Sequence, residues 1–442
     1  MAAGIGGLAV GLILLSAACR PGEKRATPEP ARSNPAVRLG VDVFLERFTG
    51  LVKGKKVGLI TNPTGVDSSL RSDVVLFLSH PDLKLAALYG PEHGAHVSAQ
   101  AGETVSFYID SNYGLPVYSL YRQAGRPAAG MPKDLDALMR SFDTRDEGKT
   151  LEPDMVKGID VMIYDMQDVG TRVYTYVSTM AYAMETCAEK AIPFIVLDRP
   201  NPIDGKAMEG PILDPAFASF IGVFPIPLRH GMTVGELALL FNDKFLAKKA
   251  DLTVIAMEGW QRTQGYDETS LPWVIPSPNM PTVETALVYP GQVAFEGTNV
   301  SEGRGTTKPF ELFGAPWIDG YALAKALNSL GLPGAAFREA WFTPTFSKFQ
   351  GKRCSGCQVH VLDRKAYRSV ETALHIIKTI RELYPDQFQF DTDYFDKVMG
   401  TSLVRNALEA GRPVRDIVAG WEPGLRAFGE LRKPYLLYNQ GI

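Results

Sequence analysis

The sequence predicts an α/β fold, in which a mostly parallel sheet is covered by helices and a smaller C-terminal α+β domain follows. Three observations lead to this prediction. From residue 54 onward, short apolar runs that end in turn formers alternate with stretches of helical spacing, which is typical of parallel strands joined by right-handed crossovers. Polar residues gather where the apolar runs end. After residue 290 the alternation gives way to a Gly-rich polar stretch.

The expected strands are apolar runs bounded by turn formers, as is usual for buried strands. A long helix is expected over 171–190, and another should begin near Thr233, which can form a capping box with Glu236. In the smaller domain, 358–364 is expected to be a strand and 371–385 a helix. The strands expected before residue 290 are 55–61, 85–89, 115–121, 158–165, 192–198 and 252–257.

The first 18 residues form an uncharged apolar run, which is typical of a signal peptide and short for a membrane span. The sequence LSAAC resembles a lipoprotein signal, so Cys19 is expected to be lipidated and to become the mature N-terminus. Residues 19–38 are rich in proline and charge and are predicted to be a tether. We therefore expect a protein that is exported to the periplasm or the cell surface and anchored to a membrane by lipid.

Composition excludes some partners. With 45% hydrophobic and 21% charged residues, the chain is an ordinary globular protein, and its 442 residues suffice for two domains. A net charge of −3 provides no basic field that would attract nucleic acid or an anionic membrane surface. Recognition of an anion must therefore be local.

No cofactor or metal is expected. The chain lacks the GxGxxG fingerprint of dinucleotide sites and the P-loop and HExxH motifs. Cys354 and Cys357 form one CxxC without the second pair that a zinc site needs, so a local disulfide or two free thiols is favoured. Cys187 lies in an apolar helical pattern and is expected to be a core thiol. His93 and His96 have no third ligand nearby in the sequence.

Five of the expected strands end in polar or charged side chains. Ligands of open parallel sheets bind beyond the carboxyl ends of the strands, so these side chains predict a site. Gly170 to Arg172 is expected to open a helix whose amides, with the arginine, hold a carboxylate or phosphate; alternatively Asp168 or Thr171 merely caps that helix. The strand-end residues are Asn62 and Thr64; Glu92 and His93; Tyr121 and Arg122; Asp165, Gln167, Asp168 and Arg172; and Asp198, Arg199 and Asn201.

The stretch 293–319 is too polar for a core and too long for an idle turn. Loops of this length are usually functional. Glu296 and Glu302 are candidate acids, and Arg304 and Lys308 are candidate anion clamps. The alternative is a solvated Gly-rich linker between domains.

Several long motifs occur in a fixed order: YGPEHG, DMQDVGTRVYTYVSTM, LDRPNP, GMTVGEL, SPNMPT and FEGTNVSEGRGTTKPFE. From about Gly40 to the C-terminus the chain resembles the bacterial exo-β-N-acetylmuramidases, which are glycoside hydrolases of peptidoglycan recycling. The resemblance implies a Rossmann-like catalytic domain over 39–290, an auxiliary domain over 291–442 and a site in the cleft between them. It also implies release of N-acetylmuramic acid from the non-reducing end of glycan fragments, with Glu92 as the leading catalytic carboxylate.

Glycoside hydrolysis usually needs a protonated carboxyl group and a second carboxylate as nucleophile or base. Glu92 is the expected acid, and its partner can be an enzyme carboxylate or the acetamido oxygen of the substrate itself. The lactyl carboxylate of muramic acid calls for an arginine, with Arg304 as first choice and Arg172 as second. The catalytic candidates are Glu92, His93, Asp165, Asp168 and Glu302, and the substrate-binding candidates are Asn62, Arg172, Tyr176, Asp198, Arg199, Asn201, Arg304 and Thr306.

Two other classes of function are alternatives to a glycoside hydrolase. A non-catalytic surface lipoprotein that binds glycan or peptide would keep the cleft without needing an acid. A serine hydrolase of esterase or lactamase type would need a nucleophilic serine, and neither GxSxG nor SxxK occurs. The expected partners are peptidoglycan-derived saccharides, and the sequence does not predict the oligomeric state.

Overall fold

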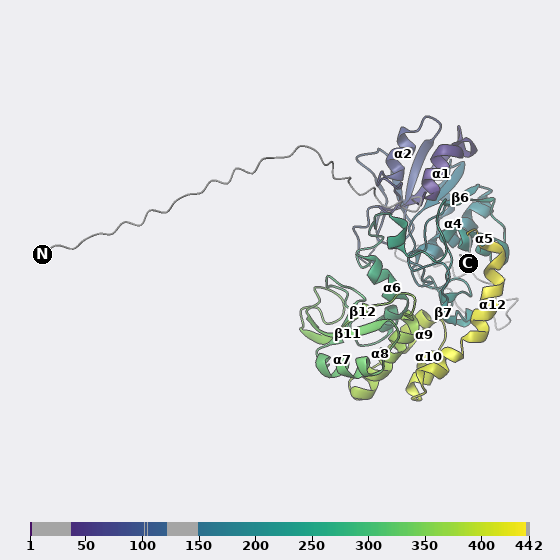
Figure 1. The fold of residues 1–442 in the computed structure, drawn as a ribbon. Coiled ribbons are helices and arrows are strands. Elements are labelled where there is room, and N and C mark those ends of the chain that lie inside the picture. Colours follow the sequence, from purple (N-terminus) through teal and green to yellow (C-terminus); the bar gives the residue numbers. More distant parts are fainter. Residues whose placement is uncertain (2–36, 101, 104, 122–148, 439–442) are drawn as a thin grey trace, which may run out of the picture. The chain divides into compact units, whose positions relative to one another are not determined.

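The computed structural model describes Met1 and residues 37–100, 102–103, 105–121 and 149–438, which are coloured in Figure 1. The described residues from Val37 onward belong to one compact unit. The predicted signal peptide, Cys19, Arg122 and nearly all of the predicted tether lie outside the described residues. Within the described part of the chain, no helix is both long and apolar enough to cross a membrane.

The first half of the described chain is built on a seven-stranded sheet with the order β3-β4-β2-β1-β5-β6-β9. Six strands are parallel, and the short edge strand β3 pairs antiparallel with β4. Each parallel strand overlaps one of the six predicted runs, so the predicted mostly parallel sheet is confirmed. The strands are β1 (Lys56–Thr61), β2 (Lys84–Gly90), β3 (Tyr108–Ile109), β4 (Pro116–Ser119), β5 (Val161–Asp165), β6 (Phe194–Leu197) and β9 (Leu252–Ile255).

Helices cover both faces of this sheet, because successive side chains of a strand point to opposite sides. In β1, Val57 and Leu59 belong to the core cluster that contains Phe44 and Phe77, whereas Ile60 belongs to the larger cluster on the other face. The first pair of helices, α1 and α2, lies at the top of Figure 1, and the second pair, α4 and α5, lies beside β6. These helices are α1 (Gly40–Arg47), α2 (Asp73–Ser79), α4 (Tyr176–Lys190) and α5 (Val234–Lys244).

The strand order reverses between β1 and β5. From β1 the chain continues to β2 and β4 on one side, and it later returns to β5, β6 and β9 on the other side. The loops that leave β1 and β5 therefore diverge at the carboxyl edge of the sheet. In open α/β sheets such a point is where ligands bind.

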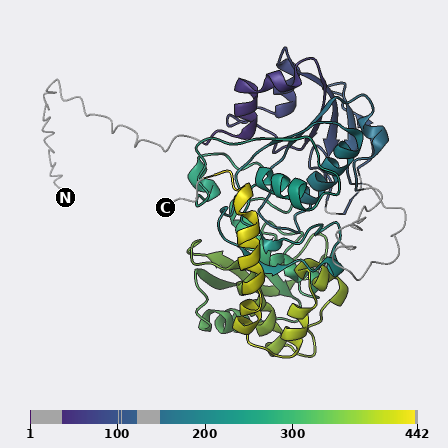
Figure 2. The same cartoon turned by 90° about the vertical axis from the view of Figure 1, so that its right-hand side faces the viewer.

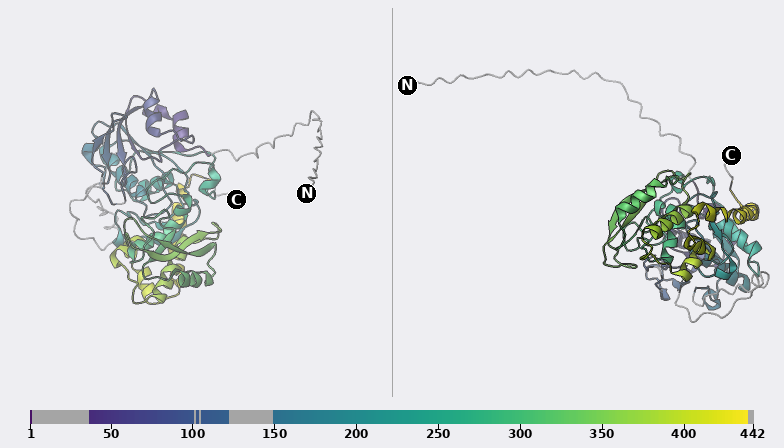
Figure 3. Two further views of the ribbon diagram at one scale, coloured as in Figure 1. Left: turned by 90° about the vertical axis from the view of Figure 1, so that its left-hand side faces the viewer. Right: turned by 90° about the horizontal axis from the view of Figure 1, so that it is seen from below.

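The C-terminal part is a smaller α+β region, as predicted. Its antiparallel sheet has the order β10-β12-β11 and lies on the side opposite α12 in Figures 1 and 3. Figure 2 shows α12 running from the C-terminal helices back toward the first sheet. The elements are α6 (Val283–Gln292), β10 (Leu312–Ala315), α7 (Gly320–Ser329), β11 (Ala335–Phe342), β12 (Cys354–Val361), α8 (Ser369–Leu383), α9 (Thr392–Met399), α10 (Leu403–Glu409), α11 (Val414–Ala419) and α12 (Glu422–Arg432).

The predicted domain boundary at residue 290 falls inside a helix. Helix α6 runs without interruption across it and contains Pro290. The boundary therefore stays a prediction. At the other end, Val37 packs with Met257, Trp260 and Tyr438, so the last residues of the predicted tether contact the compact unit.

Two predictions about the start of the helix after Gly170 need correction, and the capping box predicted at Thr233 is confirmed. The helix expected from residue 171 begins at Tyr176, because Thr171 and Arg172 instead bond to the strand β8 (Pro227–Arg229). No helix N-terminus is thus present at Gly170 to offer its amides to an anion. The capping box of Thr233 and Glu236 is present.

Cys354 and Cys357 are free and buried on β12, so the alternative of a local disulfide is wrong. Side chains at positions i and i+3 of a strand point to opposite faces, which separates the two sulfur atoms. Cys187 is a buried thiol in α4, as predicted.

Arg172 ties the first part of the chain to the C-terminal helices. Its guanidinium is buried and donates hydrogen bonds to the carbonyl oxygens of Pro211 (3.1 Å), Ile226 (2.9 Å) and Val398 (3.0 Å). Pro211 lies on β7 (Glu209–Ile212), and Val398 lies on α9. Burial lowers the pKa of Arg172 to about 9, so it remains charged near neutral pH. Arg172 is a structural cross-link.

We expect Arg172→Met to lower the free energy of unfolding by about 3–5 kcal/mol, because three buried carbonyl oxygens lose their donor. The urea midpoint and the melting temperature measure this loss. The control is Arg415→Met on α11, whose side chain is 84% exposed, and which should change stability by about 0.5 kcal/mol or less. An Arg172→Met protein that melts with the wild type would contradict the cross-link.

Candidate active site

A cavity opens where the carboxyl edge of the sheet meets the polar stretch 293–319. One wall comes from the loop after β2 and from the segment that enters α4. The other comes from residues 277–280, from α6 and from the polar stretch. The lining residues are Glu92, His93, Val173, Tyr174, Thr175, Tyr176, Ser277, Asn279, Met280, Tyr289, Arg304 and Phe310.

Glu92 presents a half-buried carboxylate to this cavity. Thr175 Oγ1 donates a hydrogen bond to Oε2 (2.8 Å), and the Gly102 amide donates a longer one to Oε1 (3.2 Å). Each oxygen thus has one protein donor, and the weaker bond leaves Oε1 better able to carry a proton. The strand β2 delivers this side chain at the carboxyl edge, as the sequence predicted.

His93 lies beside Glu92 and is buried. Its Nδ1 is 2.9 Å from the carbonyl oxygen of Ala99, so the tautomer that donates this bond leaves Nε2 as an acceptor. Burial lowers the pKa of His93 even though the Glu92 carboxylate opposes this shift, which favours the neutral ring. Its φ of 72° lies in the left-handed region, a strained conformation for a side chain and one that clusters at functional sites.

Arg304 enters the cavity from the polar stretch. It donates two hydrogen bonds to Glu296 Oε1, from Nη2 (2.6 Å) and Nε (3.1 Å), and Glu302 Oε1 lies 3.6 Å from Nε. The guanidinium carbon is 5.0 Å from the ring centroid of Phe310, in cation–π geometry. Burial opposes its charge, but Glu296 and Glu302 raise the pKa of Arg304 above its ordinary value. Among the described residues Nη1 makes no hydrogen bond.

Gly303 and Gly305, which flank Arg304, have φ angles of 79° and 78°. A Cβ at Gly303 would stand 2.6 Å from the Leu312 carbonyl oxygen, and a Cβ at Gly305 would stand 2.7 Å from the Phe346 amide. These glycines therefore allow the backbone to fold on itself.

Aromatic rings form the floor of the cavity. The centroid of Tyr174 lies 4.7 Å from that of Tyr176 and 5.9 Å from that of Tyr289, and Tyr289 lies 4.8 Å from Phe310. All three pairs have edge-to-face geometry, which fixes the orientation of the rings. Tyr176 donates a hydrogen bond to the carbonyl oxygen of Pro276. The buried hydroxyl of Tyr174 lies beside the polar groups of Ser277 and Tyr176 but makes no hydrogen bond of good geometry to a described residue.

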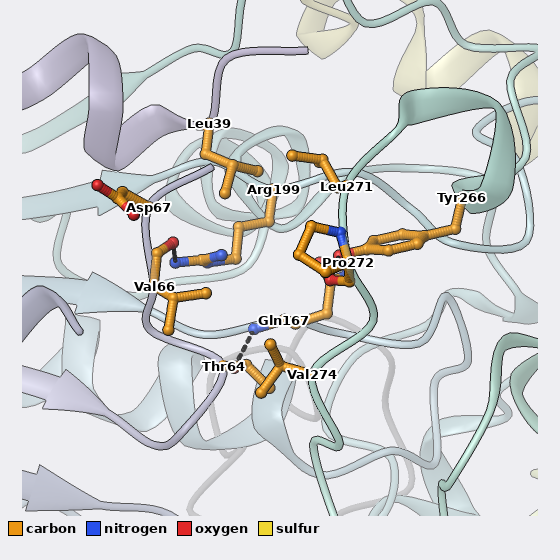
Figure 4. A pocket seen from close by; sticks show the side chains of 10 residues that line it. All are labelled: Leu39, Thr64, Val66, Asp67, Gln167, Arg199, Tyr266, Leu271, Pro272 and Val274. Carbon is orange, nitrogen blue, oxygen red and sulfur yellow. Dashed lines mark hydrogen bonds between the residues drawn. The ribbon is translucent and has the colours of Figure 1, made fainter. Parts of the chain in front are cut away.

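A second, smaller pocket of about 270 Å³ lies at the switch point between β1 and β5. Figure 4 shows the Arg199 side chain crossing this pocket. It also shows the hydrogen bond that the backbone amide of Gln167 donates to Thr64 Oγ1 (2.9 Å). Arg199 Nε donates to Asp165 Oδ1 (2.5 Å), and its Nη2 donates to the carbonyl oxygen of Val66 (2.9 Å). Asp165 and Arg199 are thus an ion pair with side chains at most 3% exposed, and the cavity that contains Glu92 is not lined by either.

The remaining strand-end candidates also bind one another or the backbone. Asp168 Oδ2 accepts from the Gly170 amide (2.6 Å), and Asn62 Oδ1 accepts from the Thr64 amide (2.9 Å). The alternative that Asp168 or Thr171 caps the following helix is wrong, because that helix begins at Tyr176 and its N-cap is Thr175. Asn201 donates to the Met232 carbonyl oxygen (3.0 Å).

Asp198 binds the start of α5 and the C-terminal segment. It accepts hydrogen bonds from Thr233 Oγ1 (2.7 Å), the Gly235 amide (2.8 Å) and Tyr438 Oη (2.5 Å). Burial raises the pKa of Asp198 to about 6 in spite of these donors. These contacts give Asp198 a structural part in the fold.

The candidates on the polar stretch are divided between the cavity and its support. Glu302 is buried and binds Lys348 Nζ (3.1 Å), which also donates to the carbonyl oxygens of Phe295 and Val300. Thr306 donates to the Gly303 carbonyl oxygen (2.6 Å) within the loop. Because much of the stretch is buried, the alternative of a solvated linker is wrong.

The structure brings Glu92, His93, Tyr176 and Arg304 of the predicted set together in one cavity. It adds Thr175, Ser277, Asn279 and Tyr289, which were not among the candidates. Ser277 and Asn279 stand in the SPNMPT motif, so the motif was a usable signal. Thr175 stands in the DMQDVGTRVYTYVSTM motif, which was likewise a usable signal. Tyr289 lies in an apolar helical context, where the sequence offers no signal for a site. Within the described residues, no cluster of His, Cys, Asp and Glu could hold a metal ion.

Two family models match the chain. The N-terminal model, described as exo-β-N-acetylmuramidase NamZ, N-terminal, matches residues 57–150 and 142–284. The C-terminal model, described as exo-β-N-acetylmuramidase NamZ, C-terminal, matches residues 287–438. Together the two models cover most of the chain.

Individual proteins resemble the chain over nearly its whole length. The peptidoglycan β-N-acetylmuramidase NamZ of Bacillus subtilis (strain 168) is 50% identical over 426 residues, which are 96% of each chain. Crystal structures of two DUF1343 family proteins from Bacteroides fragilis NCTC 9343 are also similar. The first has a TM-score of 0.79 and 36% identity and covers 91% of this chain and 99% of its own. The second has a TM-score of 0.69 and 29% identity and covers 92% and 99%.

Proposed function

The chain belongs to the exo-β-N-acetylmuramidase NamZ family, and we propose that its cavity holds the terminal sugar with Glu92 at the scissile bond. The protein is a glycoside hydrolase, which cleaves the glycosidic bond of a non-reducing-end N-acetylmuramic acid in peptidoglycan fragments. The observation that supports the role of Glu92 is its half-buried carboxylate on the wall of a cavity that two parts of the fold enclose. The rival hypotheses of a non-catalytic lipoprotein and a serine hydrolase are therefore set aside.

In this proposal Glu92 is the general acid. Cleavage requires a proton on the leaving oxygen, and a carboxylic acid at hydrogen-bond distance supplies it. Thr175 holds Oε2, so Oε1 can carry the proton toward the glycosidic oxygen. The neutral His93 ring beside it presents Nε2 as an acceptor for a sugar hydroxyl.

Arg304 is proposed to bind the lactyl carboxylate of muramic acid. The group that remains for a ligand is Nη1, since Nε and Nη2 are bound to Glu296. The two neighbouring glutamates also offset the positive charge, so a single charge-assisted hydrogen bond, worth roughly 1.5 kcal/mol or more, is expected.

Glu92→Gln should keep the fold and reduce turnover of a chromogenic N-acetylmuramic acid glycoside by roughly 10²–10⁴-fold, because the amide keeps the shape but has no transferable proton. The control is Glu382→Gln, an exposed carboxylate on α8, which should retain full activity. Melting curves establish that both variants are folded. Near-normal turnover by folded Glu92→Gln would assign the acid to another residue.

Arg304→Ala should reduce kcat/KM for muramic acid glycosides about tenfold more than for the matching N-acetylglucosamine glycosides, which lack the lactyl group. The ratio of the two losses is the measurement, because damage to the loop reduces both values equally. Equal losses would show that Arg304 supports the loop through Glu296 and Glu302 and does not read the lactyl carboxylate.

We also propose that the protein is exported and lipid-anchored through Cys19, on the basis of the apolar leader and the LSAAC sequence. In cells, the wild-type chain should partition into the detergent phase, and Cys19→Ser should move it to the aqueous phase. Mass spectrometry of the mature N-terminus provides the second measurement. Recovery of wild-type protein in the aqueous phase with an unmodified Cys19 would refute the anchor.

A further inference from the structure

Glu92 is the one carboxylate among the described residues that line the cavity. A retaining enzyme of the common kind needs a second carboxylate as nucleophile, and an inverting one needs a second carboxylate as base. The carboxylates that the sequence suggested as partners of Glu92 were Asp165, Asp168 and Glu302, and none of them lines the cavity. Asp165 binds Arg199, Glu302 binds Lys348, and Asp168 accepts from the Gly170 amide. Glu296, the other candidate acid, binds Arg304.

Tyr174 presents a different group to the cavity. Its side chain is 7% exposed, and its buried hydroxyl lies beside the polar groups of Ser277 and Tyr176 but makes no hydrogen bond of good geometry to a described residue. A buried hydroxyl without a partner is costly, so its retention on a cavity wall points to a partner on the ligand. The edge-to-face contacts with Tyr176 and Tyr289 hold the ring, which sets the hydroxyl in advance.

Glu92 and the Tyr174 hydroxyl lie on the same wall of the cavity. Thr175, the next residue after Tyr174, donates the hydrogen bond to Glu92 Oε2. In the substrate, the acetamido group is attached to C2, next to the C1 atom whose bond breaks. A sugar with its glycosidic oxygen at Glu92 therefore has its acetamido group near the same wall.

From these observations, and resting on the proposed function, we propose that the acetamido oxygen of the substrate is the nucleophile and that the Tyr174 hydroxyl positions it. In this assignment Tyr174 touches the reacting group and Glu92 is both acid and base. The substrate class is thereby narrowed to 2-acylamino sugars, since a sugar without the acyl group has no nucleophile.

The first step forms a new bond to C1, breaks the glycosidic bond and transfers one proton. A lone pair of the acetamido oxygen attacks C1, and the bond from C1 to the leaving oxygen breaks with its electron pair. Glu92 gives its proton to that oxygen, so the leaving sugar departs as a neutral alcohol. An oxazolinium ion remains, with its positive charge shared by nitrogen and carbon, opposite the carboxylate that Glu92 has become.

The second step reverses the roles. Water attacks C1, the bond from C1 to the acetamido oxygen breaks, and the acetamide is restored. Glu92 accepts the proton of that water and returns to its acid form. Two displacements at C1 retain the β configuration.

The test uses chromogenic muramic acid glycosides whose N-acyl group carries zero, one, two or three fluorine atoms. Fluorine withdraws electrons from the acyl oxygen, so kcat/KM of the wild-type protein should fall with each substitution. Equal values across the series would overturn the inference while leaving the proposed function intact. Failure to cleave the unsubstituted glycoside would overturn both.

Stereochemistry provides a second measurement. Proton NMR during early turnover should show the β-anomer of free N-acetylmuramic acid first, before mutarotation. First appearance of the α-anomer would mean inversion and would overturn the inference, because a participating acetamido group cannot give that product.

Tyr174→Phe tests the positioning role, since it removes the hydroxyl and keeps the ring. We expect about a tenfold lower kcat/KM on the N-acetyl substrate, the value of one hydrogen bond. A thiazoline analogue of muramic acid, which has the bicyclic shape of the intermediate, should inhibit the wild type and bind the variant more weakly. The matched control is Tyr367→Phe, whose buried hydroxyl likewise makes no hydrogen bond of good geometry within the described part of the chain but lies outside the cavity. Equal inhibition of Tyr174→Phe and the wild type would remove Tyr174 from the proposal.

Discussion

The buried guanidinium of Arg172 is the interaction on which the relative position of the two halves of the fold depends. It binds carbonyl oxygens of β7, of the segment before β8 and of α9, and therefore joins the sheet region to the C-terminal helices. Arg432 adds to this joint from α12 by donating to the carbonyl oxygens of His230, Gly231 and Lys206. Guanidinium groups suit this role because their several donors can satisfy carbonyl oxygens from separate segments at once.

Electrostatic pairing decides which side chains remain free for chemistry. Around the polar stretch, Arg304 lies between Glu296 and Glu302, and Lys348 holds Glu302 from the other side. Such pairing offsets the cost of removing these charges from water. Among the described residues, the hydrogen-bond partners of Glu92 are a hydroxyl and an amide, and neither is a cation. A carboxyl group held in this way can still gain and lose a proton, as acid–base catalysis requires.

The polar carboxyl edge of the sheet contains two kinds of residue that look alike in the sequence. Asp165, Asp198 and Arg199 follow strands, as Glu92 does, but their side chains satisfy one another and the backbone. A strand end exposes its side chains to whatever packs over that edge. Over β5 and β6 this is other protein, whereas over β2 it is the cavity.

The sequence by itself determined the six parallel strands of the first sheet and the capping of α5, because apolar spacing and caps are local properties. It also determined the family, since the motifs recur in a fixed order. Tertiary structure decided that Arg172 is a cross-link and that Asp165 is an ion-pair partner. It also brought Tyr174, Ser277 and Tyr289 to the same cavity as Glu92. The physical reason is that a buried charge or hydroxyl needs a hydrogen-bond or ion-pair partner, and this partner is often distant in the chain. A local sequence pattern does not indicate which distant residue will be that partner.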